Sequence, residues 1–221
     1  MRLRTKEEAI DIISQCALEY RRNLSNNCIL FVAATGNSYT CFEALFMPQN
    51  YKHLTGVRSK LNGSDFFSLA VRNRISLNDI TLTNDGVTDL KLDILPQLMN
   101  IHLTARMIGD YDQSRSLLIT DKIAGTVTAA MGFTRTNDMY LPNTALKKDV
   151  REITIHATRR RVAAIFIKPR GTELYKQLTY IAKGVMLDDD HLLPHLQDKV
   201  DIYNLTADFP IPRMSVEDST Q

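Results

Sequence analysis

The chain has 221 residues, which is long enough to bury a substantial core as one large domain or as one domain with additions. Its 44% hydrophobic and 24% charged residues are typical of a globular protein, and the net charge of +2 permits nucleic-acid binding without requiring it. No apolar run is long enough to predict a membrane-spanning helix, and three cysteines without a C-x-x-C pair favour a cytoplasmic location with reduced thiols.

The N-terminal third predicts a helix followed by a β-hairpin. Thr5 and Glu8 form a capping-box pattern, and the apolar residues that follow recur at helical spacing, so we expect a helix over residues 6–23. Two strand-like runs, at 28–32 and 39–47, flank a turn-prone segment and predict the hairpin. Apolar packing is the expected role of Cys28 and Cys41, although a hairpin could make them neighbours.

The middle of the chain has mainly helical patterns. We expect a short helix at 66–73, a short strand at 80–83 and a longer helix at 88–107. Pro96 lies inside the longer pattern and should kink or split it.

The second half is predicted to be rich in strands, at 116–119, 125–133, 139–141 and 161–167. The run at 161–167 is apolar enough for the centre of a sheet. Asn143 and Thr144 could cap a short segment at 145–150, and residues 174–185 fit a strand or a helix. A helix at 191–200 and a loosely ordered tail beyond residue 204 are expected at the end.

Few residues carry a metal-site pattern. Asp188–Asp190 are better explained as the acidic start of a helix than as a cation site. His191 and His195 share a helix face, but no third ligand is in view. No phosphate-binding loop or zinc-type cluster occurs, so neither a metal nor a cofactor is predicted.

A histidine and two groups of cations suggest a proton-transfer site and a phosphate-binding site. His53, which we place on an early edge strand, can transfer a proton near neutral pH, although a partly buried structural histidine is the alternative. A structural role is expected for His102, in an apolar helix, and for His156, in a loop. Arginines at 159–161 begin a strand and cations at 168–170 end it, which suits either a phosphate backbone or solubilisation of the strand ends.

Four stretches, at 51–57, 140–151, 161–168 and 180–184, together resemble a phage-associated family of nucleases with the fold shared by barnase, EndoU, colicin nuclease domains and RelE. The resemblance spans about residues 5–186. It implies an α+β fold in which N-terminal helices precede a central, four-stranded antiparallel sheet, with a helical insert near 64–107. The implied division is one nuclease-like domain at 1–186 and a C-terminal helix with a tail at 187–221.

The resemblance also implies a metal-independent endoribonuclease from a phage or mobile element. Such cleavage needs a base for the 2′-hydroxyl, an acid for the leaving oxygen and cations for the charged phosphorane. On this basis His53 would be the base or acid, with no evident partner. The other predicted catalytic residues are Thr55 and Thr144 as hydrogen-bond donors and Arg151 and Lys168 as cations, with Asp149 orienting Arg151. The predicted substrate-binding residues are Lys52, Asn143, Arg160, Arg161 and Lys183.

Two other functions remain open. The same scaffold could be a non-catalytic nucleic-acid- or protein-binding domain, or a transferase of ADP-ribose that uses His53 and Tyr140. RNA is the expected partner, together with an inhibitory protein, and no membrane association is predicted. The nuclease hypothesis requires His53, Thr144, Arg151 and Lys168 to lie within about 10 Å of one another, so that they can meet one phosphate.

Overall fold

The fold is α+β, as predicted from the sequence. The computed structural model describes residues 3–36, 38–83, 85–114, 118–137, 139–187, 190 and 192–213. Within these ranges the strands are β1 (Asn27–Thr35), β2 (Ser38–Phe46), β3 (Met107–Asp110), β4 (Lys122–Gly125), β5 (Ala130–Thr136), β6 (Met139–Leu146), β7 (Arg160–Pro169) and β8 (Gln177–Ile181). The helices are α1 (Lys6–Asn23), α2 (Tyr51–Thr55), α3 (Gly63–Val71), α4 (Val87–Leu98), α5 (Ile101–Thr104), α6 (Val150–Ile153) and α7 (Leu193–Leu196), with 3₁₀ turns at Pro48–Asn50 and His156–Thr158.

The described strands form one mixed sheet of eight, in the order β1-β2-β6-β5-β4-β3-β7-β8. An additional β1–β7 pairing closes the first seven into a ring, from which β8 extends. The whole sheet consists of two antiparallel sets, β2-β1-β7-β8 and β6-β5-β4-β3, joined by a parallel contact between Ala44 and Tyr140 and a short β3–β7 ladder. The sheet therefore has twice the four strands that the resemblance implies.

Helix α1 covers residues 6–23 as predicted. Thr5 and Glu8 form both bonds of the capping box, and Arg21 and Arg22 place positive charge in the last turn, where the helix dipole favours it. The β1–β2 hairpin is also confirmed. Its register pairs Cys28 with Leu45 and Val32 with Cys41, so the two thiols do not face each other across the hairpin.

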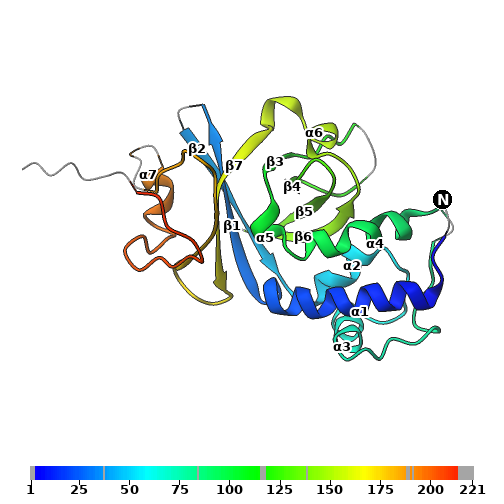
Figure 1. Cartoon of the computed structure of the whole chain (residues 1–221). Coiled ribbons are helices and arrows are strands. Elements are labelled where there is room, and N and C mark those ends of the chain that lie inside the picture. The colour runs from blue at the N-terminus through cyan, green and yellow to red at the C-terminus, as the bar shows by residue number, and fades with distance from the viewer. Residues whose placement is uncertain are drawn as a thin grey trace, which may run out of the picture.

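The two faces of the β1–β7 region bury different clusters. Helices α1 to α4 gather on one side of the sheet, and α7 with the segment that follows it lies beyond β1, β2 and β7 on the other side (Figure 1). The helical side holds the main core, which contains the rings of Phe31, Phe42, Phe46 and Phe133. The C-terminal side packs Leu192, Leu196 and Val200 against Phe166 and Tyr175, among others.

The predicted helix at 88–107 is two helices, α4 and α5, followed by β3. Pro96 lies inside α4, and the break comes only at Met99–Asn100, three residues after the proline. The predicted strand at 80–83 is reduced to a single bridge between Thr81 and Arg58. No helix in the described ranges is long and apolar enough to cross a membrane.

Several boundaries in the second half differ from the prediction. Residues 125–133 contain a turn between β4 and β5, and β4 begins at Lys122, outside any predicted strand; residues 116 and 117 lie outside the described part of the chain. Strand β6 continues through Asn143 and Thr144, so the predicted helix cap at these two residues is wrong. The β5–β6 register shifts next to Pro142, where Asn143 has no partner in β5, and such an irregularity tolerates the proline. The helix after β6 is α6, capped by Asp149.

The C-terminal region is more ordered than predicted as far as residue 213. Strand β8 resolves the ambiguity at 174–185, and the expected helix at 191–200 is the short α7. Leu205, Phe209 and Ile211 pack against the C-terminal side of the sheet, so the segment is held by buried apolar area. Residues 188, 189, 191 and 214–221 lie outside the description, which leaves the acidic run and the histidine pair without a structural account.

Candidate functional site

His53 lies on the short helix α2, so its predicted place on an edge strand is wrong. The residue is exposed, and its backbone carbonyl accepts a hydrogen bond from Lys91 Nζ at 3.1 Å. Partial desolvation, and then the charges of Lys52 and Lys91, lower the pKa of the imidazole. These cations favour the neutral ring. The residue belongs to α2, on the helical side of the sheet (Figure 1).

The two predicted threonines are buried in different places. Thr55 is fully buried, and its hydroxyl donates to the Lys52 carbonyl of its own helix at 2.8 Å. Thr144 on β6 lies beside Gly132 and Thr120. Its neighbour Ala145 belongs to the main core, so alternation along the strand directs Thr144 away from the helices that cover that core.

Arg151 is held by a neighbouring carboxylate. Asp149 caps α6 and accepts hydrogen bonds from the Arg151 amide at 2.8 Å and from its Nε at 2.9 Å. These bonds lower the pKa of Asp149. Asp149 therefore does orient Arg151, at an exposed position beside β3 and β4.

The remaining predicted residues are spread over the molecule. Lys52 Nζ donates to the Ser59 carbonyl at 2.9 Å, Arg160 Nε donates to Thr35 Oγ1 at 3.2 Å, and Asn143 interacts with the Ile119 carbonyl and with Thr120. Arg161 and Lys183 are exposed. No hydrogen bond or ion pair recorded for the described ranges joins His53, Thr144, Arg151 and Lys168 to one another.

Lys168 takes part in a different grouping, which we call the His102 cavity. This cavity has a volume of about 240 Å³ and lies where the end of α1, α5 and the β7–β8 hairpin meet. It is lined by Arg22, Asn23, Asn27, His102, Ile167, Lys168, Pro169, Gln177 and Thr179. Two cations, three amides, a hydroxyl and an imidazole thus surround one small space, and no carboxylate is among these lining residues.

Hydrogen bonds from both sides hold His102 at this cavity. Asn23 at the end of α1 donates to the Met99 carbonyl at 3.3 Å and to Asn100 Oδ1 at 3.0 Å, which fixes the start of α5. Thr179 on β8 donates to the His102 carbonyl at 2.6 Å. Residues from distant parts of the sequence therefore hold the backbone at His102.

The imidazole of His102 is neutral at physiological pH. The residue is 8% exposed, and its Nδ1 is enclosed without a hydrogen-bond partner among the described residues. Burial lowers the pKa of His102 to about 4. Nδ1 is the enclosed nitrogen, and a neutral imidazole keeps one nitrogen that can accept a proton.

His102 should make stability depend on pH. The pKa of His102 is lower in the folded protein, about 4, than the ordinary histidine value of 6.5, so the unfolded chain binds more protons as the pH falls between these values. The free energy of unfolding is therefore unaffected by His102 above pH 6.5. It falls progressively between pH 6.5 and pH 4, by at most about 3 kcal/mol. Urea unfolding at pH 7.5 and pH 4.5 should show a smaller loss of stability for His102→Gln than for the wild type. Equal losses in the two proteins would contradict the neutral, buried state.

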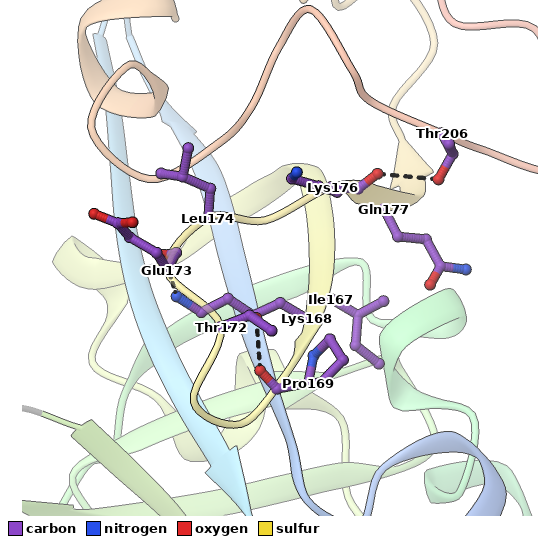
Figure 2. A pocket seen from close by; sticks show the side chains of 9 residues that line it. All are labelled: Ile167, Lys168, Pro169, Thr172, Glu173, Leu174, Lys176, Gln177 and Thr206. Atoms are coloured by element: carbon purple, nitrogen blue, oxygen red, sulfur yellow. Dashed lines mark hydrogen bonds between the residues drawn. The ribbon is translucent and has the colours of Figure 1, made fainter.

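A second, larger cavity adjoins the His102 cavity, and we call it the hairpin cavity. It has a volume of about 610 Å³ and shares Ile167, Lys168, Pro169 and Gln177 with the His102 cavity. Its other lining residues are Thr172, Glu173, Leu174, Lys176 and Thr206 (Figure 2). Lys168 Nζ donates to the Glu173 carbonyl at 2.8 Å and lies 4.5 Å from the centre of the Tyr175 ring.

Sequence reasoning did not single out His102 as a site residue. The residue lies among apolar residues of a helical pattern, which predicts a structural histidine. Local sequence carries no signal for its partners, because Arg22 and Thr179 are 80 positions before it and 77 positions after it. Only Lys168, predicted as a phosphate-binding cation, belongs both to the predicted set and to this cavity.

Comparison with known proteins gives one match. Residues 12–184 match the model of a family described as phage-Barnase-EndoU-ColicinE5/D-RelE like nuclease 4. Neither the curated proteins nor the solved structures contain a match to the chain. The matched range includes every residue that lines the His102 cavity and excludes Thr206 of the hairpin cavity.

Proposed function

This chain belongs to the phage-Barnase-EndoU-ColicinE5/D-RelE-like nuclease 4 family, and from that premise we propose that it is an endoribonuclease acting at the His102 cavity. The carrying observation is the neutral imidazole of His102 in the lining of a cavity that also contains Arg22 and Lys168. A proton acceptor and two cations around a small space suit a phosphodiester and its adjoining 2′-hydroxyl.

The proposed reaction begins with His102 taking the proton of the 2′-hydroxyl. The 2′-oxygen then bonds to phosphorus, and the bond from phosphorus to the 5′-oxygen of the next nucleotide breaks. Arg22 and Lys168 stabilise the negative charge that builds on the phosphorane, and the Lys168 ammonium supplies the proton for the leaving oxygen. The products are a 2′,3′-cyclic phosphate and a 5′-hydroxyl, formed without a metal ion.

The bound phosphate also improves His102 as a base. A pKa near 4 makes the free imidazole a weak proton acceptor. An anionic phosphate beside the ring favours its protonated form and raises its pKa towards neutrality. The substrate therefore supplies part of the electrostatic environment in which its own 2′-hydroxyl is deprotonated.

The proposal is tested with end-labelled RNA oligonucleotides in excess EDTA, beside the same sequences carrying 2′-deoxynucleotides. We expect cleavage of RNA to cyclic-phosphate ends and no cleavage at deoxy positions, because the nucleophile is then missing. Cleavage of deoxy positions, or cleavage that requires a divalent metal, would contradict this mechanism.

An RNA-binding assay and an ADP-ribose transfer assay separate the two alternative functions. RNA that is bound but never cleaved would identify a binding domain. Transfer of labelled ADP-ribose from NAD would identify a transferase, for which the structure adds no support: Tyr140 packs its ring against Phe42 at 5.4 Å, and no recorded contact in the described ranges joins it to His53.

A further inference from the structure

Two parts of the chain form the wall of the hairpin cavity, one inside the family-matched range and one beyond it. The end of β7, the following loop and the start of β8 form most of its wall, within residues 167–177. Thr206 closes the wall from a segment beyond the family-matched range. Backbone hydrogen bonds from Leu178 to the Thr206 carbonyl, at 2.8 Å, and from Thr206 to the Lys176 carbonyl, at 2.9 Å, hold this segment along β8.

The lining combines an apolar surface with one available amide. Ile167, Pro169 and Leu174 contribute apolar area. The hydroxyls of Thr172 and Thr206 already donate to the carbonyls of Pro169 and Lys176, at 2.8 Å and 3.0 Å. Their hydrogen-bond donors are therefore occupied within the protein.

Apart from the lysines Lys168 and Lys176, two side chains in the lining, Glu173 and Gln177, have polar atoms that could contact a ligand. The carboxylate of Glu173 points away from the other labelled side chains, and Gln177 lies on the opposite side of the group from Leu174 (Figure 2). In the described part of the chain the Gln177 amide makes no hydrogen bond within the protein. Its carbonyl accepts and its NH₂ donates, which is the combination that the edge of a nucleobase requires.

We propose that the hairpin cavity is a nucleobase subsite, which holds the base of the nucleotide whose phosphate lies in the His102 cavity. The two cavities share Lys168 and Gln177, so a ligand that spans them would place an anionic group in the His102 cavity beside a less polar group in the hairpin cavity. A nucleotide has this composition. The subsite rests on the proposed function for its place beside the scissile phosphate.

An unpaired base is the form that this cavity can take. A base inside a duplex is stacked on both faces and paired at its edge, so it cannot present its edge to Gln177 or its face to Leu174. The preferred substrate class is therefore single-stranded RNA, with the base nearest the cleaved bond inserted into the hairpin cavity.

The test measures binding of the four nucleoside 3′-monophosphates and of inorganic phosphate to the full chain by calorimetry. At least one nucleotide should bind about tenfold or more tightly than phosphate in the wild type. Leu174→Ala should lose that advantage while its affinity for phosphate stays within about twofold, because Leu174 lines the hairpin cavity and not the His102 cavity. Leu77→Ala, in an exposed loop leucine elsewhere, is the matched control and should behave as the wild type.

The outcomes distinguish this subsite from the proposed nuclease activity. Equal affinities for phosphate and all four nucleotides, or an unchanged nucleotide advantage in Leu174→Ala, would overturn the subsite even if RNA is cleaved. A nucleotide advantage that Leu174→Ala removes would support the subsite even if RNA is not cleaved. With an active enzyme, an abasic residue on the 5′ side of the cleaved bond should slow cleavage by about tenfold, and an unchanged rate would overturn the proposal.

Discussion

Replacement of His102 by alanine should lower the single-turnover rate of RNA cleavage by about 10²–10⁴-fold, the contribution typical of a positioned acid–base group. The substitution removes the one imidazole in the wall of the cavity that contains Arg22 and Lys168. Circular dichroism and urea unfolding should accompany the rate measurement, since the side chain is buried. A folded His102→Ala protein with the wild-type rate would exclude His102 from the reaction.

The matched control is His53→Ala, which removes the histidine predicted from the sequence. His53 is exposed on α2, and its recorded contact with Lys91 runs through the backbone carbonyl, so the substitution should leave the fold unchanged. We expect a rate within about threefold of the wild type, because this imidazole does not line the His102 cavity. Loss of cleavage in His53→Ala, with full activity in His102→Ala, would return the active site to the residues predicted from the sequence.

Replacement of Phe133 by alanine should lower the free energy of unfolding by about 3–5 kcal/mol, the usual cost of deleting a buried aromatic ring. Phe133 is fully buried on β5, and its ring centre lies 6.1, 5.6 and 6.0 Å from those of Phe31, Phe42 and Phe46. The ring thus connects β5 with both strands of the N-terminal hairpin. Urea unfolding at pH 7.5 provides the measurement.

The control for this stability prediction is Ile119→Ala, which removes an aliphatic side chain that is 84% exposed. Its unfolding free energy should stay within about 0.5 kcal/mol of the wild type, because little apolar area returns to water. A loss below about 1 kcal/mol in Phe133→Ala would show that the aromatic cluster does not stabilise the ring of strands in the way the contacts indicate.

Local patterns were sufficient for the elements that depend on nearby residues. The capping box at Thr5 and the helical spacing after it gave α1, because a helix is built from contacts three and four residues apart. The apolar run at 161–167 gave β7, which lies between β1 on one edge and β3 and β8 on the other. These predictions rest on residue types and spacing within one segment, which are the same before and after folding.

Long-range pairing decided some of the elements for which the prediction was wrong. His53 was assigned to a strand, although the strand-like run before it ends and Pro48 starts a helical turn leading into α2. Strand β6 passes through Pro142 because the β5–β6 register shifts next to it, where a residue that lacks an amide hydrogen is tolerated. The path of β6 depends on its partner strand, whereas the turn at Pro48 uses a proline at the start of a helical segment, a local signal that favours a helix at His53.

By itself the sequence determined the α+β class, the family and the first helix and hairpin, because these follow from residue type, spacing and the order of short motifs. Only the tertiary structure decided which polar side chains line the His102 cavity, since the end of α1, the start of α5 and the β7–β8 hairpin are far apart along the chain and meet in the fold. The pKa of His102 depends on the same packing, because burial removes water from the ring and no sequence pattern records that loss.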